Sequence, residues 1–205
     1  SKVISGGWIV VAFALGLFII MKTWMDGRMA MRKNMEAVSI SLEEFVASLN
    51  EGMPVRVKGT AVFMAGNPKG MPLALLHNLK HNKVLHERTI IMSVQTIDQP
   101  RVAEENRMVI THYGPGFWHA LVHYGFSETP DIPALLENLP EMPIDPMQTT
   151  YFLGRESLVI NAKSRMMWMW RKKLFWFLSL NAQAATSFFR LPPNRVVEIG
   201  AQTEL

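Results

Sequence analysis

The chain has 205 residues, of which 49% are hydrophobic and 19% are charged, and its formal net charge at pH 7 is +4. This composition excludes a disordered tail and a collagen-like repeat, and the length fits one domain of ordinary size or one domain with an appendage. Because the chain has no cysteine, a disulfide framework, a thiolate metal site and a cysteine nucleophile are also excluded.

The first predicted element is an apolar helix. No charged residue occurs from Val3 to Met21, and a lysine stands on each side of this stretch. A helix of that length rises roughly 28 Å, which nearly matches the roughly 30 Å of a bilayer's hydrocarbon layer. Trp8 and Trp24 stand near the two ends, where indole rings favour the lipid headgroups. We therefore expect a transmembrane helix over residues 1–25.

Basic residues predict the orientation of this helix. Lys2 alone precedes it, whereas Lys22, Arg28, Arg32 and Lys33 follow. The positive-inside rule then places everything downstream in the cytoplasm. A secretory signal peptide is disfavoured because the segment lacks a small-residue cleavage site and its positive charge follows it. A buried core helix is disfavoured because apolar side chains cover the whole circumference.

The next segment predicts amphipathic helix. Apolar residues recur at three- and four-residue spacing from Met29 to Leu49, which indicates one helix or two. A break near Ser39 fits this pattern, because Ser41 and the glutamates that soon follow it suit the start of a second helix. Residues 26–52 are therefore assigned to an amphipathic linker helix.

Strands and helices alternate over the rest of the chain. The expected strands are 55–63, 89–95, 107–112, 117–124, 149–153, 158–160 and 195–199, and the expected helices are 72–85, 132–139 and 164–189. The strand at 89–95 is a nearly continuous apolar run, which is typical of burial on both faces of a sheet. This order predicts an α/β or α+β cytosolic domain with a mixed sheet over residues 53–205, preceded by one transmembrane helix.

Two short patterns resemble binding motifs only in part. The turn Gly66–Gly70 lies between a strand and a helix, as a phosphate-binding loop would, but it lacks the Gly-Lys-Ser/Thr ending. A structural turn is therefore favoured. His77 and His81 have the spacing that lets two imidazoles share a metal, yet no third ligand is evident. We expect no metal there.

Three further histidines are candidates for protonation near neutral pH. His119 and His123 lie on one side of a predicted strand, with His112 nearby, although core or surface histidines are the default interpretation. A nucleophile elbow of the Gly-x-Ser-x-Gly type is missing. We predict no catalytic, cofactor-binding or metal-binding residue and no enzyme activity.

A run that mixes cations with aromatic residues extends from Arg165 to Phe177. Such a composition suits single-stranded nucleic acid or a membrane surface. Aromatic residues on a helix more often form a core or a subunit contact, while lysine and arginine side chains reach outward to solvent. We therefore favour a core or dimer contact, keep the membrane surface as the alternative, and expect no nucleic-acid partner.

Several motifs together resemble one family. They are Gly6-Gly7-Trp8 before Met21-Lys22-Thr23-Trp24 and Gly27-Arg28, Gly114-Pro115-Gly116-Phe117, Tyr124-Gly125-Phe126 with Pro130, Thr149-Thr150-Tyr151-Phe152-Leu153-Gly154-Arg155-Glu156, and Leu191-Pro192-Pro193-Asn194-Arg195-Val196-Val197-Glu198. Over nearly its whole length, the chain resembles the last membrane helix and the C-terminal domain of the KUP/HAK/KT potassium uptake permeases.

The resemblance implies a longer, multi-span parent protein, and a chain that begins at Ser1 is expected to be its final part. That parent would be a proton-coupled potassium symporter of the bacterial inner membrane, with its C-terminal domain in the cytoplasm. Potassium ion and proton would pass through earlier helices of a broken-helix, inverted-repeat architecture. No ion-binding residue is therefore carried over to this chain, whose role would be regulatory or dimerising.

The resemblance also suggests partners. The first helix would contact the lipid bilayer, and we expect homodimer contacts from Met29–Leu49, from Met166–Phe177, or from both. Cytosolic domains of some relatives resemble universal stress proteins, form homodimers, and in certain Gram-positive members bind cyclic di-AMP. The alternative function is therefore a membrane-anchored regulatory domain that senses a nucleotide effector. A further hypothesis is that protonation near His112, His119 or His123 tunes transport.

Overall fold

A computed structural model describes residues 7–36, 41–48, 54–68, 70–139, 143–159, 167–182 and 184–204. The chain divides into two compact units. The helical unit comprises residues 1–38, 157–182 and 202–205, and the sheet unit comprises residues 39–156 and 183–201. The chain therefore leaves the sheet unit after residue 156 and returns to it at residue 183.

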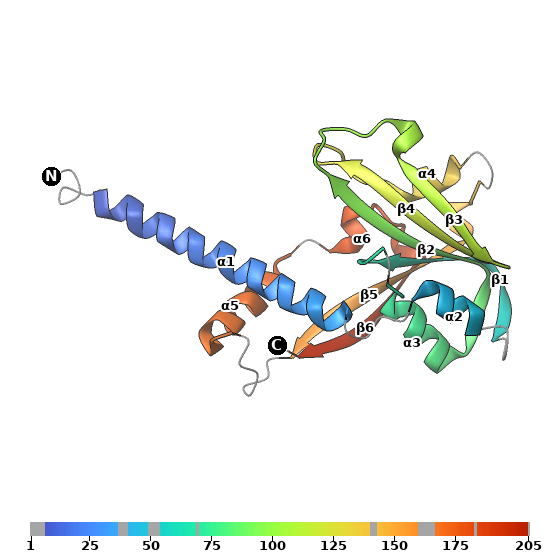
Figure 1. Ribbon diagram of the computed structural model, residues 1–205, viewed down its shortest axis with the longest axis horizontal. Coiled ribbons are helices and arrows are strands. Elements are labelled where there is room, and N and C mark those ends of the chain that lie inside the picture. Colours follow the sequence, from blue (N-terminus) through green and yellow to red (C-terminus); the bar gives the residue numbers. More distant parts are fainter. Residues whose placement is uncertain are drawn as a thin grey trace. The chain divides into compact units, whose positions relative to one another are not determined.

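A six-stranded sheet with the strand order β3-β4-β2-β1-β5-β6 forms the centre of the sheet unit (Figure 1). The strands are β1 (Val55–Ala65), β2 (Val84–Ile97), β3 (Met108–Gly114), β4 (Phe117–Gly125), β5 (Thr149–Val159) and β6 (Val196–Glu204). β1 is parallel to β2 and β5, β2 is parallel to β4, and β3 forms an antiparallel hairpin with β4. The predicted mixed sheet and the α/β class are confirmed.

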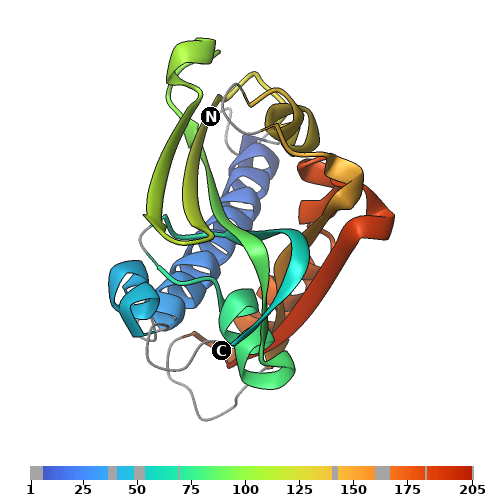
Figure 2. The same ribbon diagram turned by 90° about the vertical axis from the view of Figure 1, so that its right-hand side faces the viewer.

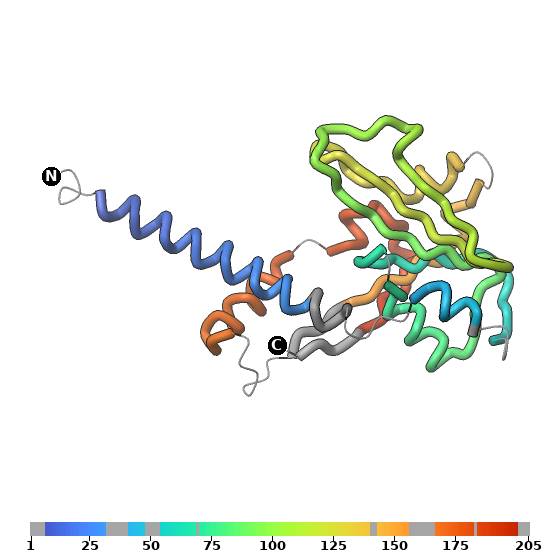
Figure 3. The backbone as a smooth tube through the Cα atoms, viewed as in Figure 1, coloured from blue at the N-terminus to red at the C-terminus, as the bar shows by residue number. Residues whose placement is uncertain are grey.

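Short helices connect these strands. The α-helices of the sheet unit are α2 (Leu42–Ser48), α3 (Leu73–Asn82), α4 (Ile132–Glu137) and α6 (Ala185–Phe188), and the 3-10 turns are 104–106, 146–148 and 193–195. α3 is the crossover between the parallel strands β1 and β2, a connection that needs an intervening helix (Figure 3). The side chain of Asp131 caps α4 by accepting a hydrogen bond from the Ala134 amide.

Strand β2 is buried on both faces because its alternate side chains belong to two cores. On one face, Ile90 and Met92 pack in a cluster with Ile132 and Leu136 of α4. On the other face, Ile91 packs in a cluster with apolar residues of α2 and α3. Figure 2 shows the twisted sheet with these helices around it. The continuous apolar run of this strand follows from its position, as predicted.

The helical unit contains α1 (Trp8–Glu36) and α5 (Met169–Leu180). Among the described residues, α1 is the one helix that is long and apolar enough to cross a membrane, over Trp8–Met31 with a mean hydropathy of 2.0. Its apolar side chains point outward, with Val10 70% and Phe13 68% exposed. The predicted membrane segment and the start of the linker therefore form a single helix, and the break predicted near Ser39 lies outside the described residues.

Several predicted boundaries are wrong, and the expected strands at 89–95 and 195–199 are parts of the longer β2 and β6. The helix expected over 72–85 ends at Asn82, because Lys83 adopts a left-handed conformation (φ 55°) and Val84 begins β2. The two strands expected at 149–153 and 158–160 are one strand, β5, since Gly154 continues the extended backbone. The helix expected over 164–189 is divided into α5 and α6, because α5 ends at Leu180 and the side chain of its C-cap, Asn181, donates to the Phe177 carbonyl at 2.8 Å.

Gly116 generates the first testable prediction. Its φ of +77° lies in the left-handed region, and a Cβ added there would meet the Glu87 carbonyl oxygen at 2.4 Å. We expect Gly116→Ala to destabilise the sheet unit by about 2–4 kcal/mol through backbone strain and overpacking. Thermal unfolding of the chain in detergent micelles measures this change. Gly154→Ala, where a Cβ meets nothing within 4 Å, is the control and should leave the midpoint nearly unchanged.

Candidate functional site

The predicted histidine pair lies on α3. The rings of His77 and His81 are stacked, with centroids 5.8 Å apart. Among the described residues, no group of three or more His, Cys, Asp or Glu side chains could hold a metal ion. The turn at Gly66–Gly70 closes with the Gly70 amide donating to the Asn67 carbonyl at 3.3 Å, and it leads from β1 to α3.

The three other histidines do not form one cluster. In the β3–β4 hairpin, His112 is paired with Trp118, whereas His119 is paired with Thr111. Side chains of paired residues share a face and neighbours alternate, so His112 and His119 project from opposite faces of the sheet. His119 and His123, four residues apart on β4, do share a face, as predicted.

His119 is the buried member of this set. Its side chain lies beside Tyr113, with ring centroids 6.3 Å apart, and its Nε2 has no hydrogen-bond partner within the part of the chain that the structure describes. Burial lowers the pKa of His119 below its ordinary value, and the negative charge of Glu43 on α2 opposes this shift. Burial therefore favours the neutral form of the His119 imidazole.

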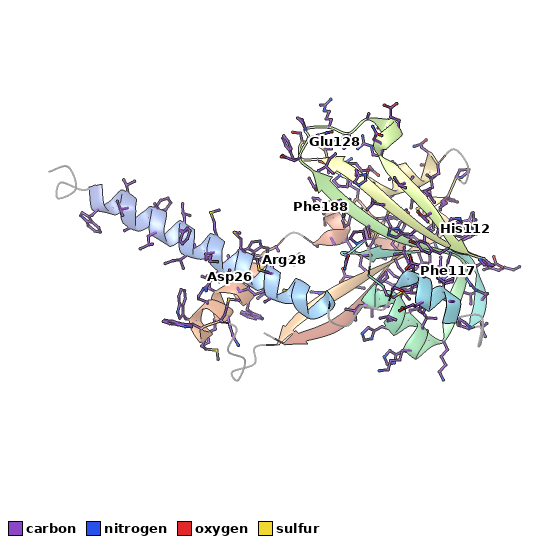
Figure 4. The ribbon with its side chains drawn as sticks, viewed as in Figure 1. Asp26, Arg28, His112, Phe117, Glu128 and Phe188 are labelled. Carbon is purple, nitrogen blue, oxygen red and sulfur yellow. The ribbon has the colours of Figure 1, made fainter. Side chains whose placement is uncertain are left out.

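A partly buried ion pair between Arg107 and Glu128 was not predicted from the sequence. Nη2 of Arg107 donates to Oε1 of Glu128 at 2.9 Å, to the Val102 carbonyl at 2.8 Å, and to the Glu104 carboxylate at 3.0 Å. The guanidinium also lies 4.8 Å from the ring centroid of Tyr124. The pair joins the loop after β2 to the loop after β4, where Figure 4 labels Glu128.

Glu128 completes this tie through its second oxygen. Oε2 accepts hydrogen bonds from the Gly125 amide at 2.7 Å and the Val102 amide at 3.1 Å. The hydrogen bond from Arg107 is the largest cause that lowers the pKa of Glu128 to about 2. Gly125 is required beside it, because a Cβ there would meet the Pro100 carbonyl oxygen at 2.3 Å. The motif Tyr124-Gly125-Phe126 was the available signal for this arrangement.

Arg56 holds the opposite end of the same strands. It donates through Nη1 to the His86 carbonyl at 2.9 Å and through Nη2 to the Pro115 carbonyl at 3.3 Å. Its guanidinium carbon lies 5.0 Å from the ring centroid of Phe117. These contacts fix the Gly114–Phe117 turn onto β2. Because the donors face backbone oxygens, the arrangement is a structural clamp.

One hollow of about 380 Å³ opens on the sheet unit. It is lined by Thr186, Ser187, Arg190, Leu191, Pro193, Val196 and Glu198. Both charged groups in it are already paired, Arg190 with Asp131 and Glu198 with Arg155, each at 3.3 Å. These ion pairs are exposed, so their electrostatic contribution is small.

In the helical unit, α5 packs on α1 through polar contacts of Arg171 and apolar contacts of Phe175. Arg171 donates through Nη2 to Asp26 at 2.8 Å and through Nε to the Thr23 hydroxyl at 3.0 Å. Phe175, which is completely buried, lies against Gly27, where a Cβ would meet its ring at 2.3 Å. Trp24 flanks Phe175, with ring centroids 5.6 Å apart. The predicted core contact of the 165–177 run is therefore made within this chain by part of the run.

Comparison with known proteins decides the family. Residues 58–205 match the family model described as "K+ potassium transporter C-terminal domain". The chain belongs to the potassium transporter family. This confirms the resemblance stated from the sequence motifs. No solved structure matches the chain.

Curated relatives in the potassium transporter family match the whole chain. A "Probable potassium transport system protein Kup" from Anaeromyxobacter dehalogenans (strain 2CP-C) is 49% identical over 98% of this chain and 31% of the relative. Proteins with the same name from Thiobacillus denitrificans and Myxococcus xanthus are 46% and 45% identical over 100% of this chain, and over 33% and 31% of their own lengths. The chain thus spans about a third of the length of these relatives.

Glu128 generates a prediction about pH. Its folded pKa of about 2 lies below its ordinary value of 4.5, so the stability it contributes is fully present above about pH 4.5 and is lost as pH falls toward 2. We expect Glu128→Gln to lower the unfolding midpoint at pH 7 and to reduce the loss of stability between pH 4.5 and 2. Thermal unfolding at several pH values measures both effects.

The exposed carboxylate of Glu105, in the same loop region, provides the control. Glu105→Gln should retain the acid sensitivity of the unaltered chain. An unaltered acid sensitivity in Glu128→Gln would contradict the assignment.

Proposed function

We propose that the chain is the last membrane helix and the C-terminal domain of a transporter that couples potassium uptake to proton entry across the bacterial inner membrane. The observation that carries this proposal is the match of the whole chain, α1 included, to potassium transport system proteins. Because those relatives are about three times as long, the ion path belongs to the part of the parent that precedes this chain.

The orientation proposed for the domain is cytoplasmic. Lys22 and Arg28 follow the apolar part of α1, and α5, which packs beside them, carries Arg171, Lys172 and Lys173 without a carboxylate. Basic residues concentrated at one end of a membrane helix favour the cytoplasmic side. The sheet unit would then lie in the cytoplasm.

The role proposed for this segment is regulation and dimerisation of the transporter, without catalysis. The absence of catalysis is supported by the two arginine clamps of the sheet unit, because Arg56 and Arg107 donate their hydrogen bonds to backbone carbonyls and carboxylates within the fold. Met29 is 66% exposed in the Met29–Leu49 segment proposed for homodimer contacts. Cross-linking that finds only monomers in membranes would count against a dimer.

A membrane-anchored domain that senses a nucleotide is the second candidate. The hollow beside Arg190 favours it, because that guanidinium is 58% exposed and could exchange Asp131 for a phosphate. A bound nucleotide at 100 times its Kd would stabilise the chain by about 2.7 kcal/mol. Thermal unfolding with increasing cyclic di-AMP or ATP tests this candidate, and a midpoint that does not move with ligand concentration removes it.

The transport proposal predicts the outcome of an uptake experiment. Transport-deficient bacterial cells would express the complete parent protein or a form truncated after Arg28, and rubidium uptake would be measured at equal membrane abundance. We expect the parent to take up rubidium and the truncated form to lose or change that activity. Arg171→Gln, which breaks the hydrogen bonds to Asp26 and Thr23, should have a smaller effect of the same kind.

Arg155→Gln is the matched control for Arg171→Gln, because the Arg155 side chain is 73% exposed in a surface ion pair. It should leave uptake unchanged. A parent that takes up no rubidium at normal abundance would refute the transport proposal and favour the nucleotide sensor.

The histidine hypothesis predicts a change in the pH profile of uptake. His119→Gln replaces the buried imidazole on one face of the sheet, whereas His112→Gln acts on the opposite face. If protonation at His112, His119 or His123 tunes transport, the profile shifts in at least one of the variants His112→Gln, His119→Gln and His123→Gln. Replacement of all three histidines without any shift would remove the hypothesis.

A further inference from the structure

One face of α5 is apolar and exposed. The exposed positions follow each other at helical spacing and are Met169, Trp170, Lys173, Trp176, Phe177 and Leu180. Phe177 is 59% exposed and Leu180 is 64% exposed, and Lys173 is the one charged residue among them. Lys172 and Phe175 on the other face are buried. The six exposed residues, called the Met169–Leu180 stripe below, therefore remain uncovered after α5 has packed on α1.

The position along α1 at which α5 packs indicates where α5 would lie relative to a bilayer. Its hydrogen-bonded contacts are Thr23 and Asp26, and Ala30 and Met31 share the apolar cluster of Phe175. At 1.5 Å per residue, these contacts lie roughly 22 to 34 Å along the helix from Trp8, and a hydrocarbon layer of roughly 30 Å that begins at Trp8 ends among them. Figure 1 shows α5 beside this part of α1.

The composition of α5 suits a lipid interface. Its sequence, MWRKKLFWFLSL, contains three cations and no carboxylate, with two tryptophans inside the helix and Trp168 at its N-cap. Tryptophan favours the headgroup level, and lysine reaches from an apolar surface toward phosphate. Trp168 itself is 76% exposed. Of these cations Lys173 is exposed, and anionic headgroups complement its charge.

We propose that α5 is an interfacial helix whose Met169–Leu180 stripe inserts into the cytoplasmic leaflet, with Lys173 directed to anionic lipid phosphates. The proposal rests on the proposed membrane insertion of α1. It assigns a lipid surface to the face that would otherwise contact water, a second copy of the chain, or earlier helices of the parent. An amphipathic helix of this kind lies about 5–10 Å into the boundary between headgroups and acyl chains.

Because the chain has no cysteine, single spin labels test the proposal directly. Labels would be placed by Phe177→Cys, by Leu17→Cys in the apolar part of α1, and by Phe126→Cys, a 61% exposed apolar residue of the sheet unit. The full chain would be reconstituted in vesicles that contain phosphatidylcholine and phosphatidylglycerol at a ratio of about three to one. Polybasic segments recognise membranes with this kind of anionic content. Collisions with oxygen report lipid, and collisions with a nickel chelate report water.

The expected result orders the three labels by depth. The label at 177 should be several-fold more accessible to oxygen, relative to nickel, than the label at 126, and shallower than the label at 17. Lys173→Glu should move the label at 177 toward water in vesicles with phosphatidylglycerol, and much less in phosphatidylcholine alone. The same labels in the complete parent protein should give the same order.

Two results would overturn the proposal while α1 stays inserted. Nickel accessibility at 177 equal to that at 126 would place the stripe in water. Shielding of 177 from both reagents would place it against protein, and a short distance between labels on two copies would identify a dimer. If the label at 17 is itself accessible to nickel, the insertion of α1 fails, and the interfacial assignment fails with it.

Discussion

The sheet unit depends on the burial of β2, which is hydrogen-bonded along both edges and covered on both faces. Its pairing with β4 extends from Thr89 opposite Phe117 to Ile97 opposite Gly125, and an arginine stands near each end of this ladder. Arg56 holds the turn before β4 to the first residues of β2, and Arg107 with Glu128 holds the loop that follows β2 to the end of β4. A long parallel pair has no hairpin to fix its register, so these two clamps supply the constraint that chain connectivity does not.

Hydropathy patterns predicted most of the elements, because burial imposes a period that the sequence must carry. The apolar run of β2 and the Gly114–Gly116 turn were sufficient for the central strands and the hairpin. Boundaries set by single backbone conformations could not be predicted in the same way. Lys83 ends α3 in a left-handed backbone conformation that is uncommon for lysine. No residue type in this part of the sequence indicates that the helix ends there. The partners Arg107 and Glu128 are separated by 21 positions and look like ordinary surface charges until the sheet brings two loops together.

In the helical unit, the contacts between α1 and α5 accommodate a carboxylate on a long apolar helix. Asp26 is neutralised from both sides, by Lys22 one turn earlier at 2.9 Å and by Arg171 from α5 at 2.8 Å. Buried or interfacial charges are tolerated when they are paired and hydrogen-bonded, and Thr23 adds to the network by accepting from Arg171. Gly27 allows Phe175 to approach the helix backbone, so the polar and apolar contacts reinforce each other over a short segment.

The separation of Asp26 and Arg171 by 145 positions also has a consequence for biosynthesis. At translation rates of 5–20 residues per second, roughly 7–30 s pass between the emergence of the two side chains from the ribosome. During that interval the nascent α1 holds its carboxylate with Lys22 alone, an intrahelical partner that is present from the beginning. Lys22 is therefore the counter-ion that Asp26 has first, and Arg171 joins the pair only after most of the sheet has been synthesised.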